Sequence, residues 1–255
     1  MDIEAGARKV LTIKGVDFAF RWRPPGTFQM GSPSSEAERD SDEGPRYEVT
    51  LTKGFWMLET PVTQGMYCAI AGSNSSYFKS GDNYPAENVS WLDCQSFCES
   101  LNALGGAPEG FAFRLPTEAE WEYACRAGTN APYFWGATLN GDKANCDGNC
   151  PYGGVSKGRY LEKTSAVGSY TPNAWGLYDM RGNVWEQRAD WFGCYAAGPQ
   201  TDPTGPPAIS SFLYFRVLRG GSWRNRAENC RSACRYGGAA TNRSKRCGFR
   251  FVLGR

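Results

Sequence analysis

The segment from Thr129 to Gly176 constrains the fold of this 255-residue chain most, because it is rich in Gly, Asn and Pro and follows no hydrophobic period. The whole chain contains 31 Gly and 15 Pro, which favour turns and irregular backbone. A long irregular segment inside a compact domain is usually functional, or is held by packing or by a metal. The chain must therefore bury a core with few regular elements.

Short periodic segments surround this region. The alternation in YEVTLT (47–52) predicts a strand, and the polar, acidic segment 32–45 predicts a loop. Three helices are expected: one from Thr63 to Gly72, one with Ser90 as N-cap that ends at Gly105–Gly106, and one capped by Thr117 and Glu120 that ends at Gly128. Further strands are expected over 212–218, 231–235 and 248–253. These elements predict a single α+β domain over 1–255.

The charge is unevenly distributed along the chain. Residues 215–255 carry ten Arg and one Lys against one Glu, so the remainder is acidic although the net charge is only +2. Such arginines either bind an anionic partner or donate hydrogen bonds to carboxylates and carbonyls in the acidic remainder of the chain. We expect the second role for the four arginines inside patterned sequence blocks, which are Arg219, Arg231, Arg235 and Arg250.

The chain contains no histidine, which excludes Ser–His–Asp and Cys–His nucleophile activation within it. It also removes the commonest ligand of zinc, copper and non-haem iron. The ten cysteines include no CxxC motif, and most are expected to be buried free thiols. No apolar run is long enough to span a membrane, and the first residues do not form a signal peptide.

Several sequence blocks resemble the formylglycine-generating enzyme family, also called the sulfatase-modifying factor family. The most specific blocks are FRLPTEAEWEYACRAG (113–128), NAWGLYDMRGNVWE (173–186), RVLRGGSW (216–223) and CGFRFV (247–252). The resemblance implies a C-type-lectin-like fold with long loops. It also implies one candidate activity, the copper-dependent oxidation of a sulfatase cysteine to formylglycine by a cysteine pair. Asn225 stands where the first of these cysteines is expected, so this alternative depends on Cys230 and Cys234.

A second branch of the family resembles the C-terminus more closely. Variable proteins of diversity-generating retroelements end in a pattern similar to GSWNNN…RSANRNRNN…NRNNN.GFR, in which randomised Asn codons alternate with fixed letters. The chain aligns with this pattern without a gap, and every randomised position except Lys245 holds a residue that an AAC codon reaches by adenine changes alone. The resemblance implies a variable ligand-binding region over about 216–255. Its contact residues would be Arg224, Asn225, Arg226, Cys234, Tyr236, Gly238, Ala239, Ser244, Lys245 and Arg246.

The block GLYDMRGNVWE implies a structural calcium site in the family. The matching ligands are the side chains of Asp179 and Glu186 and the carbonyls of Gly182 and Val184. Oxygen-only ligation suits a hard cation. The alternative is that both carboxylates pair with framework arginines.

The sequence thus predicts a non-catalytic binding protein, with no required cofactor, that recognises a protein or another cell-surface ligand rather than nucleic acid. A location at the cell surface or outside the cell is expected with this role. The ten contact residues should be exposed on one face, whereas Trp223, Arg231, Arg235 and Phe249 between them should be buried. Alternation along a strand would turn Cys234 and Tyr236 outward and Arg235 inward.

Overall fold

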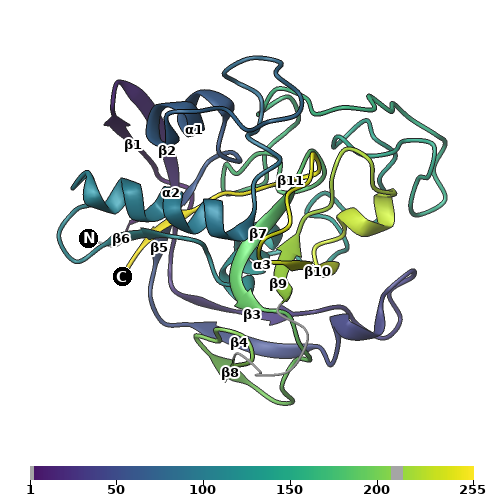
Figure 1. Cartoon of the computed structure of the whole chain (residues 1–255). Helices are drawn as coiled ribbons and strands as arrows, with labels where there is room; N and C mark the ends of the chain where they lie inside the picture. Colours follow the sequence, from purple (N-terminus) through teal and green to yellow (C-terminus); the bar gives the residue numbers. More distant parts are fainter. Residues whose placement is uncertain (1–2, 208–214) are drawn as a thin grey trace.

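Three sheets and three α-helices form the described part of the molecule, a computed structural model of residues 3–207 and 215–255 (Figure 1). The five-stranded sheet has the order β1 (Arg8–Ile13), β2 (Val16–Arg23), β5 (Phe55–Leu58), β12 (Val252–Gly254) and β6 (Ala112–Arg114). The four-stranded sheet has the order β10 (Arg235–Ala239), β9 (Phe215–Arg219), β7 (Trp185–Trp191) and β11 (Cys247–Gly248). The three-stranded sheet joins β3 (Gly26–Met30), β4 (Tyr47–Leu51) and β8 (Gln200–Thr201). The predicted α+β class is confirmed.

The helices are α1 (Gln64–Ala71), α2 (Trp91–Ala103) and α3 (Glu118–Arg126). Two short 3₁₀ helices, η1 (Ser41–Glu43) and η2 (Ala227–Cys230), lie in the connections. In Figure 1, α1 and α2 lie on the side of the molecule that carries β1, β2 and β6, while the four-stranded sheet lies near the centre. The segment 129–176 contains no helix or strand within the described chain, as expected.

The core joins both ends of the chain. Phe251, in the last sequence block, packs its ring against Phe18, Phe20, Phe97 and Phe113 from three other elements. A second cluster lies between the three-stranded sheet and α3, with Trp121 at 0% exposure. Burial of such aromatic area supplies most of the driving force for folding. The C-terminal blocks are therefore part of the core that orients the residues between them.

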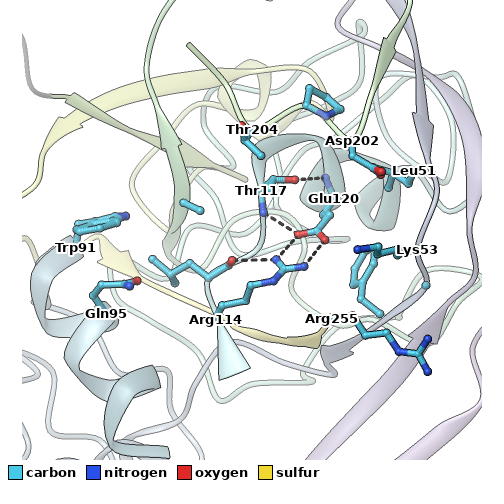
Figure 2. A pocket seen from close by; sticks show the side chains of 15 residues that line it. Leu51, Lys53, Trp91, Gln95, Arg114, Thr117, Glu120, Asp202, Thr204 and Arg255 are labelled. Carbon is cyan, nitrogen blue, oxygen red and sulfur yellow. Dashed lines mark hydrogen bonds and ion pairs between the residues drawn. The ribbon is translucent and has the colours of Figure 1, made fainter. Parts of the chain in front are cut away.

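All three helices begin where the sequence predicts. Thr63 accepts the N–H of Met66, and Ser90 accepts the N–H of Asp93. Thr117 and Glu120 form the expected capping box, in which Thr117 Oγ1 accepts the Glu120 N–H (3.1 Å) and Glu120 Oε2 accepts the Thr117 N–H (2.8 Å; Figure 2). The expected stop of the third helix is displaced by one residue, because Ala127 rather than Gly128 forms the left-handed cap (φ 46°).

The strand expected over 231–235 is wrong. The chain there turns, because Arg231 N–H donates to the carbonyl of Glu228 and Cys234 N–H donates to the carbonyl of Arg231. Strand pairing begins only at Arg235, which opposes Arg219. The strand expected over 248–253 is divided into β11 and β12 by a buried segment, and the strand over 212–218 is observed as β9 from Phe215, with 212–214 outside the described residues.

Candidate ligand-binding face

The arginines of the patterned blocks form a buried framework beneath the C-terminal surface. Arg219 is fully buried and donates to Glu118 Oε1 (2.9 Å), to Glu122 and to the carbonyl of Cys234 (3.0 Å). Arg235 holds the same Glu118 in a bidentate pair of 2.8 and 2.7 Å. Both acidic residues belong to α3, so the helix fixes the position of β9 and of the start of β10.

The other two framework arginines reach different parts of the chain. Arg231 donates to Glu43 at 2.8 and 2.6 Å and to Glu36 at 2.7 Å, both from the acidic loop predicted at 32–45. Arg250 donates to both oxygens of Glu186 at 2.9 Å. Charge-assisted bidentate pairs of this kind specify geometry as well as charge. The framework role predicted for the four arginines is confirmed.

Pairing also determines which buried carboxylates keep their charge. Burial raises the pKa of Glu122, but Arg126 and Arg219 outweigh burial and hold the pKa below its ordinary value. In contrast, burial raises the pKa of Asp190, which accepts the backbone N–H of Glu118 (2.7 Å), to about 7. Guanidinium contact is thus what stabilises the ionised carboxylate in this interior.

The residues between the blocks surround one cavity of about 520 Å³. Its floor contains Trp185, Leu218 and Cys247. Seven of the ten predicted contact residues line it: Asn225, Cys234, Tyr236, Gly238, Ala239, Ser244 and Arg246. The tertiary structure therefore brings predicted residues from both ends of the variable region to one place.

Four of the ten predicted contact residues are exposed as expected, and five more are only half-buried. Arg224, Arg226 and Arg246 are exposed, and Tyr236 has 59% of its surface exposed. Asn225, Gly238, Ala239, Ser244 and Lys245 are half-buried. The intervening Trp223, Arg231, Arg235 and Phe249 are all buried. The adjacent pair Arg235 and Tyr236 shows the division best, since one side chain enters the framework and the next lies in solvent.

Cys234 is the exception, and its expected exposure is wrong. Its side chain is 2% exposed and packs with Trp185, Leu218 and Cys247, and burial raises its pKa to about 12. The alternation that predicted an outward side chain requires extended backbone, whereas Cys234 ends the turn before β10. Cys234 therefore forms part of the cavity wall rather than of its rim.

Two other predicted contact residues already interact with side chains of the protein itself. The Oδ1 atom of Asn225 accepts the Nε1–H of Trp185 (2.9 Å) and the hydroxyl of Ser222 (2.5 Å). The ammonium group of Lys245 lies over the ring of Tyr77, 4.5 Å from its centre. These contacts restrict what either side chain offers to a ligand.

Sequence reasoning missed several residues that line the cavity. Asn229 and Asn242 belong to the same C-terminal region, where their type and position gave a usable signal. Trp185 comes from β7, and its ring lies 5.8 Å from that of Tyr236. Asp40 comes from the distant acidic loop, and no local pattern places it at this cavity.

The two carboxylates proposed as calcium ligands differ in whether they already have partners. Asp179 is buried, its Oδ2 accepts the Gly168 N–H (2.6 Å), its Oδ1 has no partner, and burial raises its pKa to about 6. Glu186, however, is saturated by Arg250, by Arg188 (3.0 Å) and by Trp121 Nε1–H (2.8 Å). The alternative of arginine pairing is thus confirmed for Glu186 and wrong for Asp179.

Gly182 and Val184 lie in the buried turn before β7. A cation bound there would have the free oxygen of Asp179 but would compete with two guanidinium groups for Glu186. Of the two carboxylates proposed as calcium ligands, only Asp179 has an oxygen that is free to bind the ion. Calcium at these four residues stays a prediction.

The thiols named for copper belong to different buried clusters. Cys230 packs with Tyr133, Leu139 and Cys146, whereas Cys234 packs with Trp185. Burial and neighbouring groups raise the pKa of both thiols, and for Cys230 the hydrogen bond with Cys146 is the largest cause. The thiolate form that copper ligation needs is therefore disfavoured at both positions. In the described chain all ten cysteines are free, and seven of them are buried.

A second cavity, of about 570 Å³, lies at the start of α3 and contains Lys53, Trp91 and Arg255 (Figure 2). Its other charged groups already have partners, since Arg114 holds Glu120 at 2.7 and 2.7 Å and Asp202 accepts the N–H of Thr52 (2.8 Å). This cavity belongs to the capping region of the helix and contains none of the predicted contact residues.

Comparison with known proteins places the chain in a family. The model of the sulfatase-modifying factor enzyme 1-like domain matches residues 20–254, so the chain belongs to this family. The formylglycine-generating enzyme of Streptomyces coelicolor is 37% identical over 178 residues, which are 66% of this chain and 52% of the enzyme. The chain spans about half the length of the curated relatives it matches.

Two solved structures resemble the chain over nearly its full length. Treponema denticola variable protein 1 has a TM-score of 0.79 and 26% identity, with 96% of this chain and 98% of that chain covered. PvdO from Pseudomonas aeruginosa has a TM-score of 0.81 and 27% identity, with both chains fully covered. The family and fold expected from the sequence blocks are thus confirmed, and the relatives include both an enzyme and a variable protein. Within the described residues no helix is long and apolar enough to cross a membrane.

Proposed function

We propose that this protein is a non-catalytic binding protein whose C-terminal face is diversified by a retroelement. The observation that carries the proposal is the cavity of about 520 Å³, which gathers seven of the ten residues at randomised positions above a framework of buried arginine pairs. Side chains on such a rim can change with little effect on folding, because the framework residues supply the stabilising contacts. The likeness to a variable protein over nearly the full chain supports the same role.

The face of this particular sequence suits a ligand with acidic groups. Arg226 reaches Glu228 only at 3.9 Å, and within residues 3–207 and 215–255 neither Arg224 nor Arg246 forms an ion pair. Tyr236 adds an exposed aromatic ring of the kind that anchors interfaces. We infer an acidic polypeptide segment on the surface of another cell or host as the ligand, which places the protein itself at the cell surface or outside the cell.

A displayed library of random peptides tests the binding role. Immobilised protein should enrich peptides that contain Asp or Glu, and the triple variant Arg224→Ala, Tyr236→Ala and Arg246→Ala should bind the enriched peptides at least tenfold more weakly. A control variant, Lys53→Ala with Arg255→Ala, removes two charges from the other cavity and should bind like the parent. Equal binding by the triple variant would place recognition elsewhere on the molecule.

Genomic context tests the diversification directly. We expect a reverse transcriptase gene and a near-identical template copy of the 3′ end beside the coding sequence. The template copy should differ at adenines within the codons of the contact positions, with Lys245 as the one position that an AAC template codon does not explain. Substitutions spread evenly over framework and contact codons would refute the retroelement.

The second candidate function is copper-dependent oxidation of a sulfatase cysteine, which 37% identity to a formylglycine-generating enzyme favours. The test is Cu(I) titration of the reduced protein, followed by an assay for the aldehyde in a cysteine peptide under oxygen. Stoichiometric copper binding that Cys230→Ser abolishes, together with aldehyde formation, would replace the binding role by this one. We expect neither, because Cys230 and Cys234 lie in separate clusters.

A further inference from the structure

The irregular segment around Cys146 lies directly beside the first part of the ligand-binding face. Asp147 N–H donates to the carbonyl of Asn225 (2.8 Å), and Ala227 N–H donates to the carbonyl of Cys150 (3.1 Å). Asp147 and Arg226 also form an isolated parallel bridge. Two segments that are far apart in the sequence are thus held in register by backbone hydrogen bonds.

This register brings two thiols together under the face. Cys146 and Cys230 both have 0% of their surface exposed, and the interaction with Cys146 is the largest cause of the raised pKa of Cys230. They share an apolar cluster with Tyr133, Leu139 and Tyr152. Two thiols in one small, dry cluster, on segments that backbone hydrogen bonds hold side by side, are the pair that the fold favours for a disulfide.

We propose that Cys146 and Cys230 form a disulfide that locks the turn at 225–230 to the irregular segment. The oxidant is a small-molecule disulfide such as oxidised glutathione. One protein thiolate attacks it, forming a mixed disulfide and releasing one reduced thiol. The second protein thiolate then attacks the mixed disulfide, the Cys146–Cys230 bond forms, and the second reduced thiol leaves. The protein loses two electrons and two protons, and the oxidant gains both.

Burial determines when this reaction occurs. The hydrogen bond with Cys146 and the loss of solvent raise the pKa of Cys230 well above its ordinary value, so the folded protein contains little thiolate at this site. Exchange is therefore expected during folding, before the cluster closes. Once formed, the bond is shielded from reductants by the same burial.

The cross-link has a consequence for the binding face. Arg224, Asn225 and Arg226 follow Gly221, whose position beside the Cys230 sulfur leaves no space for a side chain. A bond from Cys230 to Cys146 would hold this turn in its binding position and lower the conformational entropy that a ligand must remove. The disulfide itself does not depend on the proposed function, because it can form whether or not the face binds a ligand.

Refolding of the full chain with oxidised and reduced glutathione tests the proposal. Free thiols are then alkylated under denaturing conditions, and tryptic peptides are mapped without reduction. We expect peptide 144–157 linked to peptide 227–231, with fragmentation assigning the bond to Cys146 rather than to Cys150. Reduction of the oxidised protein should lower the Tm by roughly 5–10 °C. Alkylation of both Cys146 and Cys230, or a bond from either to another cysteine, would overturn the proposal.

A matched pair of variants separates the cross-link from a packing effect. Cys146→Ser should remove the linked peptide and the Tm change on reduction. Cys125→Ser alters another buried cysteine, whose Sγ contacts the carbonyl of Met180 (3.7 Å), and should keep both. If Cys146→Ser does not fold, the peptide map of the parent protein alone decides the question.

Discussion

Two groups of arginines in the last quarter of the chain have opposite roles, although they are neighbours in sequence. Arg219, Arg231, Arg235 and Arg250 are at most 4% exposed, and each holds at least one buried carboxylate. Arg224, Arg226 and Arg246 are exposed, and the only ion pair that the structure shows for them is the 3.9 Å contact of Arg226. The comparison shows that residue type alone does not separate scaffold from ligand surface here. The position relative to β9, β10 and α3 does.

The largest expected effect comes from breaking the framework group. Arg219→Met should lower the free energy of unfolding by about 3–5 kcal/mol, because Glu118 and Glu122 stay buried and lose a charge partner. Arg224→Met is the matched control and should change it by less than about 0.5 kcal/mol. Urea unfolding of both variants measures the difference, and equal effects would remove the distinction between the groups.

Asp190 tests how burial acts on a carboxyl group, because burial raises its pKa from 3.8 to about 7. Between about pH 4 and pH 7 the folded protein keeps a proton that the unfolded chain releases, so stability falls as pH rises through this window. Asp190→Asn should therefore match the parent near pH 4 and be more stable at pH 8 by roughly 1–3 kcal/mol.

Unfolding curves across this pH range measure the effect at Asp190. The exposed control Asp82→Asn should follow the parent at every pH. A constant difference between Asp190→Asn and the parent would show that Asp190 is ionised throughout.

The helix that supports the framework can be weakened separately. Thr117→Ala removes the N-cap of α3 and should cost about 1 kcal/mol. Thermal melting detects this loss, and peptide binding by the C-terminal face should stay unchanged. Thr241→Ala, in an exposed loop, is the control. An unaltered melting curve for Thr117→Ala would mean that the cap contributes nothing to stability.

The smallest expected effect on stability is at Tyr236, which lies beside a framework arginine in the sequence. Tyr236 directly follows Arg235, yet Tyr236→Ala should change the free energy of unfolding by less than about 0.5 kcal/mol because its ring is mostly in solvent. The same substitution should weaken binding of the selected peptides. A loss of more than about 2 kcal/mol in unfolding would show that the ring belongs to the core through Trp185.

Much of the architecture is already determined by local sequence. The starts of all three helices follow from Thr63, Ser90 and Thr117, because an N-cap hydroxyl satisfies a backbone N–H only a few residues away. The separation of Arg235 from Tyr236 follows from strand alternation, which is also local. These features need no information from distant parts of the chain.

Only the tertiary structure decided the remainder. The burial of Cys234 and the turn at 231–234 depend on hydrogen bonds that compete with strand pairing, and periodicity cannot show which prevails. Arg231 pairs with Glu43, and Cys230 packs in the same cluster as Cys146 rather than in that of its near neighbour Cys234. Such partners come from segments far apart in the chain. Their contact depends on how the sheets and loops pack together, which no short stretch of sequence records.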